Sequence, residues 1–205
     1  MLSALAFLVM VVIKIPIVLF LSYEPKDVII TIGGFLFGPL ASVAMSVVVS
    51  LVEMITVSRT GFIGAIMNIV STCAFAGTAT IIYKHKKTMV GAAVGLVSGV
   101  ILTTIVMILW NYLLTPIYMN QLRSDIAAML VPIFLPFNLL KGGLNAAITM
   151  LLYKPIRIAL DKSRLLPAVK GPDVKPSKIN IGAVLISVFV IITCVLLILS
   201  IRGII

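Results

Sequence analysis

An amide and an ammonium group lie one helical turn apart in the segment P-F-N-L-L-K-G at residues 136–142. The i, i+3 spacing of Asn138 and Lys141 places both side chains on one face of a helix. An amide offers donors and an acceptor, whereas a lysine offers donors only. Together they can hold a neutral heterocycle whose edge carries carbonyl and ring N–H groups. The pair therefore indicates a binding site for a small polar molecule.

Three further polar side chains lie in or beside apolar segments. Asn111 ends one such segment, Asn68 lies inside another, and Asp27 begins a third. Polar groups within a membrane are costly, which makes each a functional candidate. The alternative stays open that the asparagines hydrogen-bond between helices and that Lys141 extends to the membrane surface. Aromatic rings that can stack on a ligand occur at Phe20, Tyr23, Trp110, Tyr112 and Phe137, of which Trp110 and Tyr112 also suit an interface belt.

Other charged and amide groups have simpler interpretations. We expect Lys14 to extend to the outer surface where Pro16 ends the first helix, and Glu53 to pair with Arg59 near the end of the third. Asn145 is assigned no role beyond helix packing.

The usual catalytic motifs are missing from the sequence. It contains no G-x-x-x-x-G-K-[ST], G-x-S-x-G or H-E-x-x-H pattern, and its one histidine, His85, lies among lysines. Cys73 and Cys194 both fall in apolar segments, where they give neither a disulfide framework nor a metal site. General acid–base and metal chemistry thus lack their groups, and we expect a binding protein with no catalytic residue and no metal.

Composition places these residues in a lipid bilayer. Of the 205 residues, 61% are hydrophobic and 11% charged, with a mean hydropathy of +1.27. The net charge of +10 comes mainly from two loops, 84–87 and 154–178. Basic loops that flank apolar segments mark the cytoplasmic side of a membrane, so the charge argues for orientation and against nucleic-acid binding.

Apolar length and punctuation predict an all-α integral membrane protein. The predicted helices occupy residues 2–21, 27–37, 39–57, 61–83, 88–114, 135–155 and 178–202. We expect the first to begin upstream of Met1. If both basic loops lie inside, the chain between them crosses an even number of times. Residues 115–134 then form an external loop, with a short surface helix at 122–131.

The stretch 27–57 is too long for a single crossing. About 31 helical residues measure ~46 Å, against ~30 Å for the hydrocarbon core. Gly33, Gly34, Gly38 and Pro39 interrupt its middle, which favours two spans over one unbroken helix. The candidate polar residues then gather toward the outer leaflet.

Three stretches resemble the substrate-binding S components of energy-coupling-factor (ECF) vitamin transporters, and within them the riboflavin-specific type. They are Y-E-P-K-D at 23–27 leading into G-F-L-F-G-P at 34–39, the glycine-rich stretch from Gly61 to Asn68, and P-F-N-L-L-K-G at 136–142 with W-N-Y at 110–112 upstream. The resemblance covers about residues 1–155.

The resemblance implies a six-helix domain at 1–155 that binds a vitamin from outside. It is followed by a basic cytoplasmic linker at 156–177 and an additional transmembrane helix within 178–205. Asparagines and a lysine hydrogen-bond the flavin ring in that family, and the implied substrate-binding residues are Asn111, Asn138, Lys141, Asn68, Asp27, Glu24 and Tyr23.

The implied partners are a transmembrane coupling protein and two ATPase subunits, which use ATP and energise uptake across the prokaryotic cell membrane. Two alternatives remain open. One is an S component for another vitamin, such as a pyridoxine-like or pyrimidine compound, and the other is a structural membrane subunit with no ligand.

Overall fold

The computed structural model describes residues 1–18, 21–57, 61–162 and 181–201. Within these residues the chain is almost entirely helical. The elements are α1 (Leu2–Val12), β1 (Ile15–Val18), β2 (Leu21–Tyr23), α2 (Lys26–Phe37), α3 (Pro39–Thr56), α4 (Gly61–Thr72), η1 (Cys73–Gly77), α5 (Thr78–His85), α6 (Met89–Met119), α7 (Arg123–Met129), η2 (Leu130–Phe134), α8 (Leu135–Lys162) and α9 (Ile181–Ile201). The two η elements are π-helical turns within longer helices.

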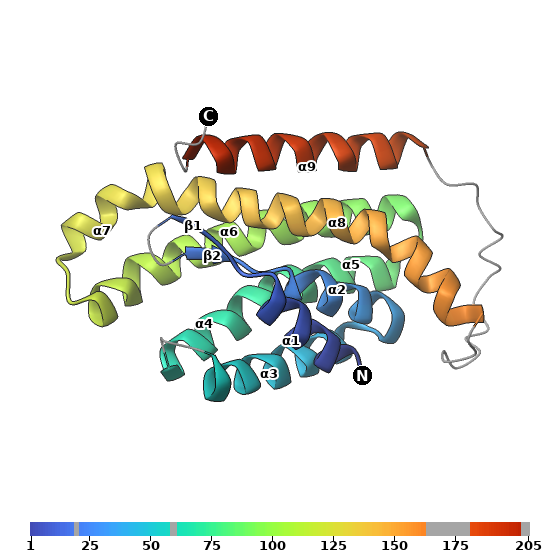
Figure 1. The fold of residues 1–205 in the computed structure, drawn as a ribbon, viewed down its shortest axis with the longest axis horizontal. Helices are drawn as coiled ribbons and strands as arrows, with labels where there is room; N and C mark the ends of the chain where they lie inside the picture. The colour runs from blue at the N-terminus through green and yellow to red at the C-terminus, as the bar shows by residue number, and fades with distance from the viewer. Residues whose placement is uncertain (19–20, 58–60, 163–180, 202–205) are drawn as a thin grey trace.

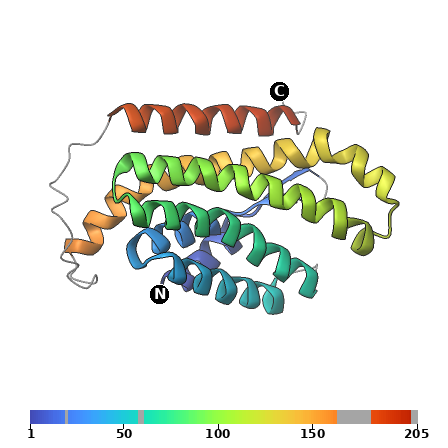
Figure 2. The same ribbon diagram turned by 180° about the vertical axis from the view of Figure 1, so that it is seen from behind.

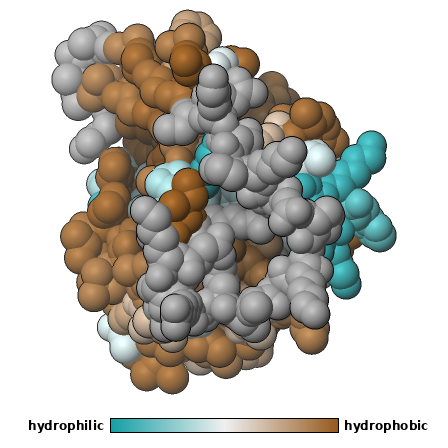
Figure 3. Space-filling view, turned by 90° about the vertical axis from the view of Figure 1, so that its right-hand side faces the viewer, coloured by the Kyte–Doolittle hydropathy of each residue, from teal (hydrophilic) through white to brown (hydrophobic). Residues whose placement is uncertain are grey.

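Five of the helical segments are long and apolar enough to cross a membrane. They cover Pro39–Thr56, Gly61–His85, Met89–Ile117, Arg123–Ile156 and Ile181–Ile201. Seen from one end, the described surface is mostly hydrophobic, with a hydrophilic region to one side (Figure 3). The expected all-α membrane protein is confirmed, and α1 and α2 are shorter helices packed into the same bundle (Figure 1).

The predicted break between residues 27 and 57 is confirmed. α2 ends at Phe37 and α3 begins at Pro39. Gly38 between them has φ +96, a conformation that side-chain-bearing residues rarely adopt, and proline is favoured at the first position of a helix. The chain therefore reverses direction at this point, and the single unbroken helix is excluded.

The predicted helix over residues 2–21 is wrong beyond Val12. Residues 15–18 and 21–23 instead form two short antiparallel strands, in which Ile15 pairs with Tyr23 and Pro16 with Ser22. Pro16 has no N–H for a helix, and β-branched residues on both sides of it favour extended backbone. The hairpin enters the bundle and leads directly into α2.

The loop predicted for residues 115–134 is shorter than expected. α6 continues to Met119 and ends at Asn120, whose φ of 52 is left-handed. The predicted short helix appears as α7, but the π-helical turn η2 joins it to α8 without a break, and α8 continues to Lys162. A π-helical turn accommodates Pro132 and Pro136 inside one continuous helix.

Close helix packing aligns α6 against the helix formed by α4, η1 and α5. Gly91, Gly95 and Gly99 recur every four residues, and a Cβ on Gly95 or Gly99 would come within 2.7 Å of a backbone oxygen of that helix. Small residues at this spacing let helix backbones approach. Figure 2 shows α5 and α6 side by side. α9 runs along the outer face of α8 at the top of Figure 1.

Candidate functional site

A buried lysine, Lys26, stands at the start of α2 and is 1% exposed. Its Nζ lies 3.1 Å from Glu24 Oε2 and also forms an ion pair and a hydrogen bond with Glu53 of α3. Asn68 of α4 donates to the same Glu53 oxygen at 2.9 Å. Lys14, beyond the end of α1, binds the other side of Glu24, with Nζ 2.7 Å from Oε1. Ion pairs thus connect the hairpin region, α2 and α3.

The neighbouring residue, Asp27, is the centre of a second group. Thr72 of α4 donates to Asp27 Oδ1 at 2.7 Å, and Asn145 of α8 donates to Oδ2 at 3.2 Å. Lys141, one turn before Asn145, places its Nζ 3.6 Å from the same Oδ2. Asp27 therefore draws together α2, α4 and α8, and its pair with Lys141 is the longest of the ion pairs.

The two groups form one polar cluster with balanced charge, comprising Lys14, Glu24, Lys26, Asp27, Glu53 and Lys141 together with the neutral Asn68, Thr72 and Asn145. Three ammonium groups face three carboxylates. The chain has only six acidic residues, so half of them lie in this cluster. Buried charges are tolerated when paired in this way.

Glu24 lies in the turn between β2 and α2, where its environment favours the charged form. Burial opposes ionisation, but the ammonium groups of Lys26, Lys141 and Lys14 outweigh it. They lower the pKa of Glu24 to about 2. This carboxylate is therefore ionised throughout the physiological pH range.

Some buried polar atoms close to Asp27 have no hydrogen-bond partner among the described residues. They include Tyr23 Oη and Asn145 Oδ1, and the residues that carry them are 5% and 1% exposed. Trp110 Nε1 on α6 is in the same condition. An unpaired buried polar atom costs about 1–3 kcal/mol, which favours sites where a ligand supplies the missing partner.

Asn111 and Asn138 are buried but bond within their own helices. Asn111 Nδ2 donates to Met107 O at 2.7 Å, and its Oδ1 accepts from Thr115 at 2.9 Å. Asn138 Nδ2 donates to Phe134 O at 2.7 Å. The structure therefore brings Glu24, Asp27, Asn68 and Lys141 together in the cluster, with Tyr23 beside Asp27, whereas these two asparagines form local bonds.

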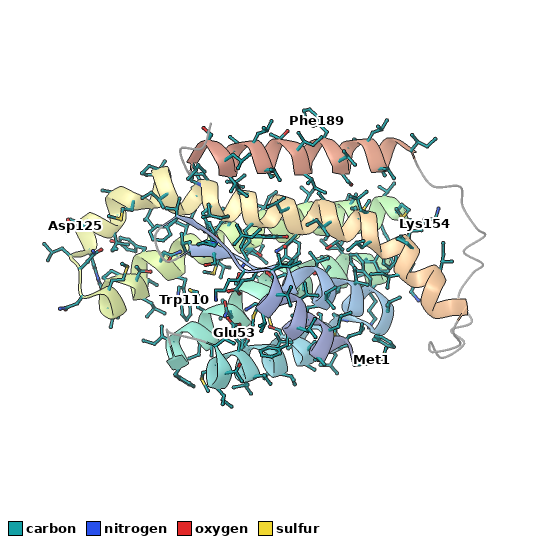
Figure 4. All side chains as sticks on the ribbon, viewed as in Figure 1. Met1, Glu53, Trp110, Asp125, Lys154 and Phe189 are labelled. Carbon is teal, nitrogen blue, oxygen red and sulfur yellow. The ribbon has the colours of Figure 1, made fainter. Side chains whose placement is uncertain are left out.

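Three simpler expectations change. Lys14 binds Glu24 instead of only extending outward, and Asn145 has a specific partner in Asp27. Glu53 pairs with Lys26, while Arg59, its predicted partner, lies outside the described residues. Glu53 lies near the middle of the molecule in Figure 4, between the ends marked by Asp125 and Lys154.

Lys26 is the functional candidate that the sequence analysis missed. The available signal is its position, since Lys26 and Asp27 together precede the apolar run of residues 28–37. Among the residues that the structure describes, no group of three or more histidine, cysteine or acidic side chains is arranged to hold a metal ion.

Residues 1–153 match the family described as the substrate-specific component of ECF transporters. The chain belongs to this family. The family match confirms that the chain is a multi-pass membrane transport subunit that works with other subunits, and not an enzyme.

Individual relatives extend the same comparison. The chain is 31% identical over 163 residues to the riboflavin transporter RibU of Staphylococcus aureus (strain TCH60), a match that covers 75% of this chain and 85% of the relative. It is 27% identical over 154 residues to the riboflavin transporter FmnP of Bacillus subtilis (strain 168), covering 71% and 81%.

A solved S component of a bacterial ECF transporter has a similar fold. Its structure matches with a TM-score of 0.66 and 30% sequence identity, covering 78% of this chain and 92% of that chain. The six-helix core expected from the resemblance is therefore confirmed as an S-component fold.

Proposed function

We propose that this protein is the riboflavin-binding subunit of an ECF importer. Two relatives are named riboflavin transporters, and P-F-N-L-L-K-G at 136–142 fits a ligand edged with carbonyl and ring N–H groups. The observation that carries the proposal is the convergence at Asp27 of Lys141 with the unpaired atoms Tyr23 Oη and Asn145 Oδ1. A polyhydroxylated flavin supplies both donors and acceptors to such atoms.

Lys141 is the first choice for a ligand contact. Its side chain is 15% exposed and its 3.6 Å pair with Asp27 is loose, so the ammonium group can turn to a flavin carbonyl at little cost. Asn138 lies one turn earlier on the same face of α8 and is the second choice. Asn111 already uses its amide nitrogen for Met107 and its amide oxygen for Thr115, and we place it third. Tyr23, Glu24, Asp27 and Asn68 complete the proposed site.

The proposed orientation places this site on the outside of the cell. The residues 84–87 are exposed and basic, and they lie at the end of α5, away from the start of α2. Basic loops face the cytoplasm, so loops 84–87 and 154–178 are inside and the hairpin is outside. The proposed energising partners are a transmembrane coupling protein and two ATPase subunits.

The decisive experiment is a binding titration with the purified full chain in detergent. Riboflavin fluorescence should be quenched on binding, and a tightly bound vitamin should raise the melting temperature of the protein. Pyridoxine and thiamine are the matched comparisons. The proposal is refuted if the purified protein is colourless, micromolar riboflavin does not raise its melting temperature, and the riboflavin fluorescence is not quenched. Stabilisation by another vitamin instead would identify an S component of different specificity.

A further inference from the structure

The helix α9 lies beyond residues 1–153, where the family match ends, yet it is packed closely onto α8. The contact is at a glycine. A Cβ on Gly143 of α8 would lie 3.5 Å from Cys194 Sγ and 4.0 Å from Val190 Cγ1, both on α9. Both are ordinary van der Waals distances, so side chains of α9 lie directly against α8 at this position, and Figure 1 shows the two helices running alongside each other.

One face of α9 reaches past α8 to the hairpin. Cys194 and Ile198 are one turn apart and are 7% and 8% exposed, while Ile192 and Leu196 on the other side of the helix are half-exposed. α9 contacts β1. The hairpin and α8 residues that share a buried cluster with Cys194 and Ile198 are Ile17, Leu21, Tyr23, Phe137, Leu140 and Leu144.

The hairpin depends on such packing. β1 and β2 have four and three residues, and an isolated two-stranded hairpin of this size is marginally stable at best. Its buried side chains, Ile17, Leu21 and Tyr23, need apolar partners to hold the strands in place. Two of the buried partners in this cluster, Cys194 and Ile198, come from α9, which lies outside the residues 1–153 that match the family.

The hairpin is directly connected to the polar cluster. Lys14 precedes β1, Tyr23 ends β2, and Glu24 follows at once. Any shift of the hairpin therefore moves Tyr23 Oη relative to Asp27 and moves Glu24 relative to Lys26. A helix that fixes the hairpin also fixes this edge of the site.

We propose that α9 is a positioning helix for the candidate site, and that Cys194 and Ile198 hold the β1–β2 hairpin against α8 and so slow the escape of bound ligand. The part that concerns ligand escape rests on the proposed riboflavin function. The part that concerns the hairpin does not depend on which ligand binds.

The test compares two identical substitutions on opposite faces of α9 in the full chain. Ile198→Ala removes a buried contact with the hairpin cluster, and Ile192→Ala removes the same atoms from the outward face. Hydrogen exchange should accelerate at residues 21–23 in Ile198→Ala only. Riboflavin should dissociate roughly three- to tenfold faster from Ile198→Ala, with little change in its association rate.

Each outcome bears on a separate claim. Equal exchange and equal dissociation rates in the two variants would overturn the positioning role of α9. If the parent protein fails to bind riboflavin, the proposed function fails, while hydrogen exchange still decides whether α9 holds the hairpin. If Ile198→Ala does not fold, the pair Ile198→Val and Ile192→Val gives the same comparison with a smaller perturbation. Equal hydrogen exchange at residues 21–23 in these two variants would also overturn the proposal.

Discussion

The two ends of α2 are built in opposite ways. At its start, Lys26 and Asp27 meet charged and amide groups from three other helices. Near its end, Phe35 packs against Tyr83 of α5 and Tyr153 of α8, with ring centroids 4.5 and 5.3 Å away, and the two tyrosine hydroxyls hydrogen-bond to each other. The same helix is held by ion pairs at one end and by aromatic packing at the other.

This contrast between the two ends of α2 suggests different roles for their residues. Hydrophobic residues of similar volume often stabilise a protein as well as a buried ion-pair network does, so five buried or partly buried charges need a reason other than folding. Aromatic packing needs no such reason, because it contributes its own burial energy. We therefore expect substitutions at the polar end to affect ligand binding as well as stability, and those at the aromatic end to affect stability alone.

The largest effect is expected for Lys26→Met. Removal of the ammonium leaves Glu24 and Glu53 as buried charges that have lost their shared partner, and breaking a buried pair in this way costs about 3–5 kcal/mol. Thermal unfolding in detergent measures the loss. The matched control is Lys14→Met, where the lysine side chain is 40% exposed and the expected cost is below about 1 kcal/mol. Equal losses in the two variants would mean that Lys26 is not the centre of the network.

Acid should weaken the polar end before the aromatic end. The pKa of Glu24 falls from 4.5 to about 2 in the folded protein, because nearby ammonium groups outweigh its burial. A lowered pKa adds stability that is fully present above about pH 4.5 and is lost as the pH falls toward 2. Unfolding temperatures between pH 6 and 2 should thus decline more steeply in the parent than in Glu24→Gln. Parallel curves would contradict the assignment.

Local and long-range features differed in how well the sequence predicted them. The turn at Gly38-Pro39 was predictable because both residues act through their own backbone geometry. The hairpin was not, since the strands of four and three residues lie in an apolar run that also suits a helix. Periodicity cannot separate a short strand from a helix in such a run.

Some members of the polar cluster were predicted from the sequence, but their connections were not. Asp27, Asn68 and Lys141 stood out as polar residues in or beside apolar segments, and the family resemblance added Glu24. Their partners come from elements far apart in the sequence, as with Asn145 and Asp27, which are 118 residues apart. The pair between Glu53 and Lys26 was missed for this reason, because the bundle brings Lys26 to Glu53 from another helix.

A moderate effect on binding is expected for Lys141→Ala. The lysine has the loosest ion pair of the cluster, so its loss should leave folding nearly intact while riboflavin binding weakens by about 1–3 kcal/mol, as for a lost charged hydrogen bond. Fluorescence titration measures the change, and Asn138→Ala should act in the same direction. If both variants bind riboflavin like the parent, the site lies elsewhere in the bundle.

The smallest effect is expected at the aromatic end, for Tyr83→Phe. This substitution keeps the ring that packs on Phe35 and removes only the hydroxyl that bonds to Tyr153. The free energy of unfolding should fall by about 0.5–1.5 kcal/mol, the usual contribution of one hydrogen bond. Riboflavin affinity should not change, because none of the proposed ligand contacts lies among the three rings. A loss of affinity as large as that of Lys141→Ala would contradict the separation of the two ends and would show that the aromatic contacts are coupled to Asp27, which α4 and α8 also contact through Thr72 and Asn145.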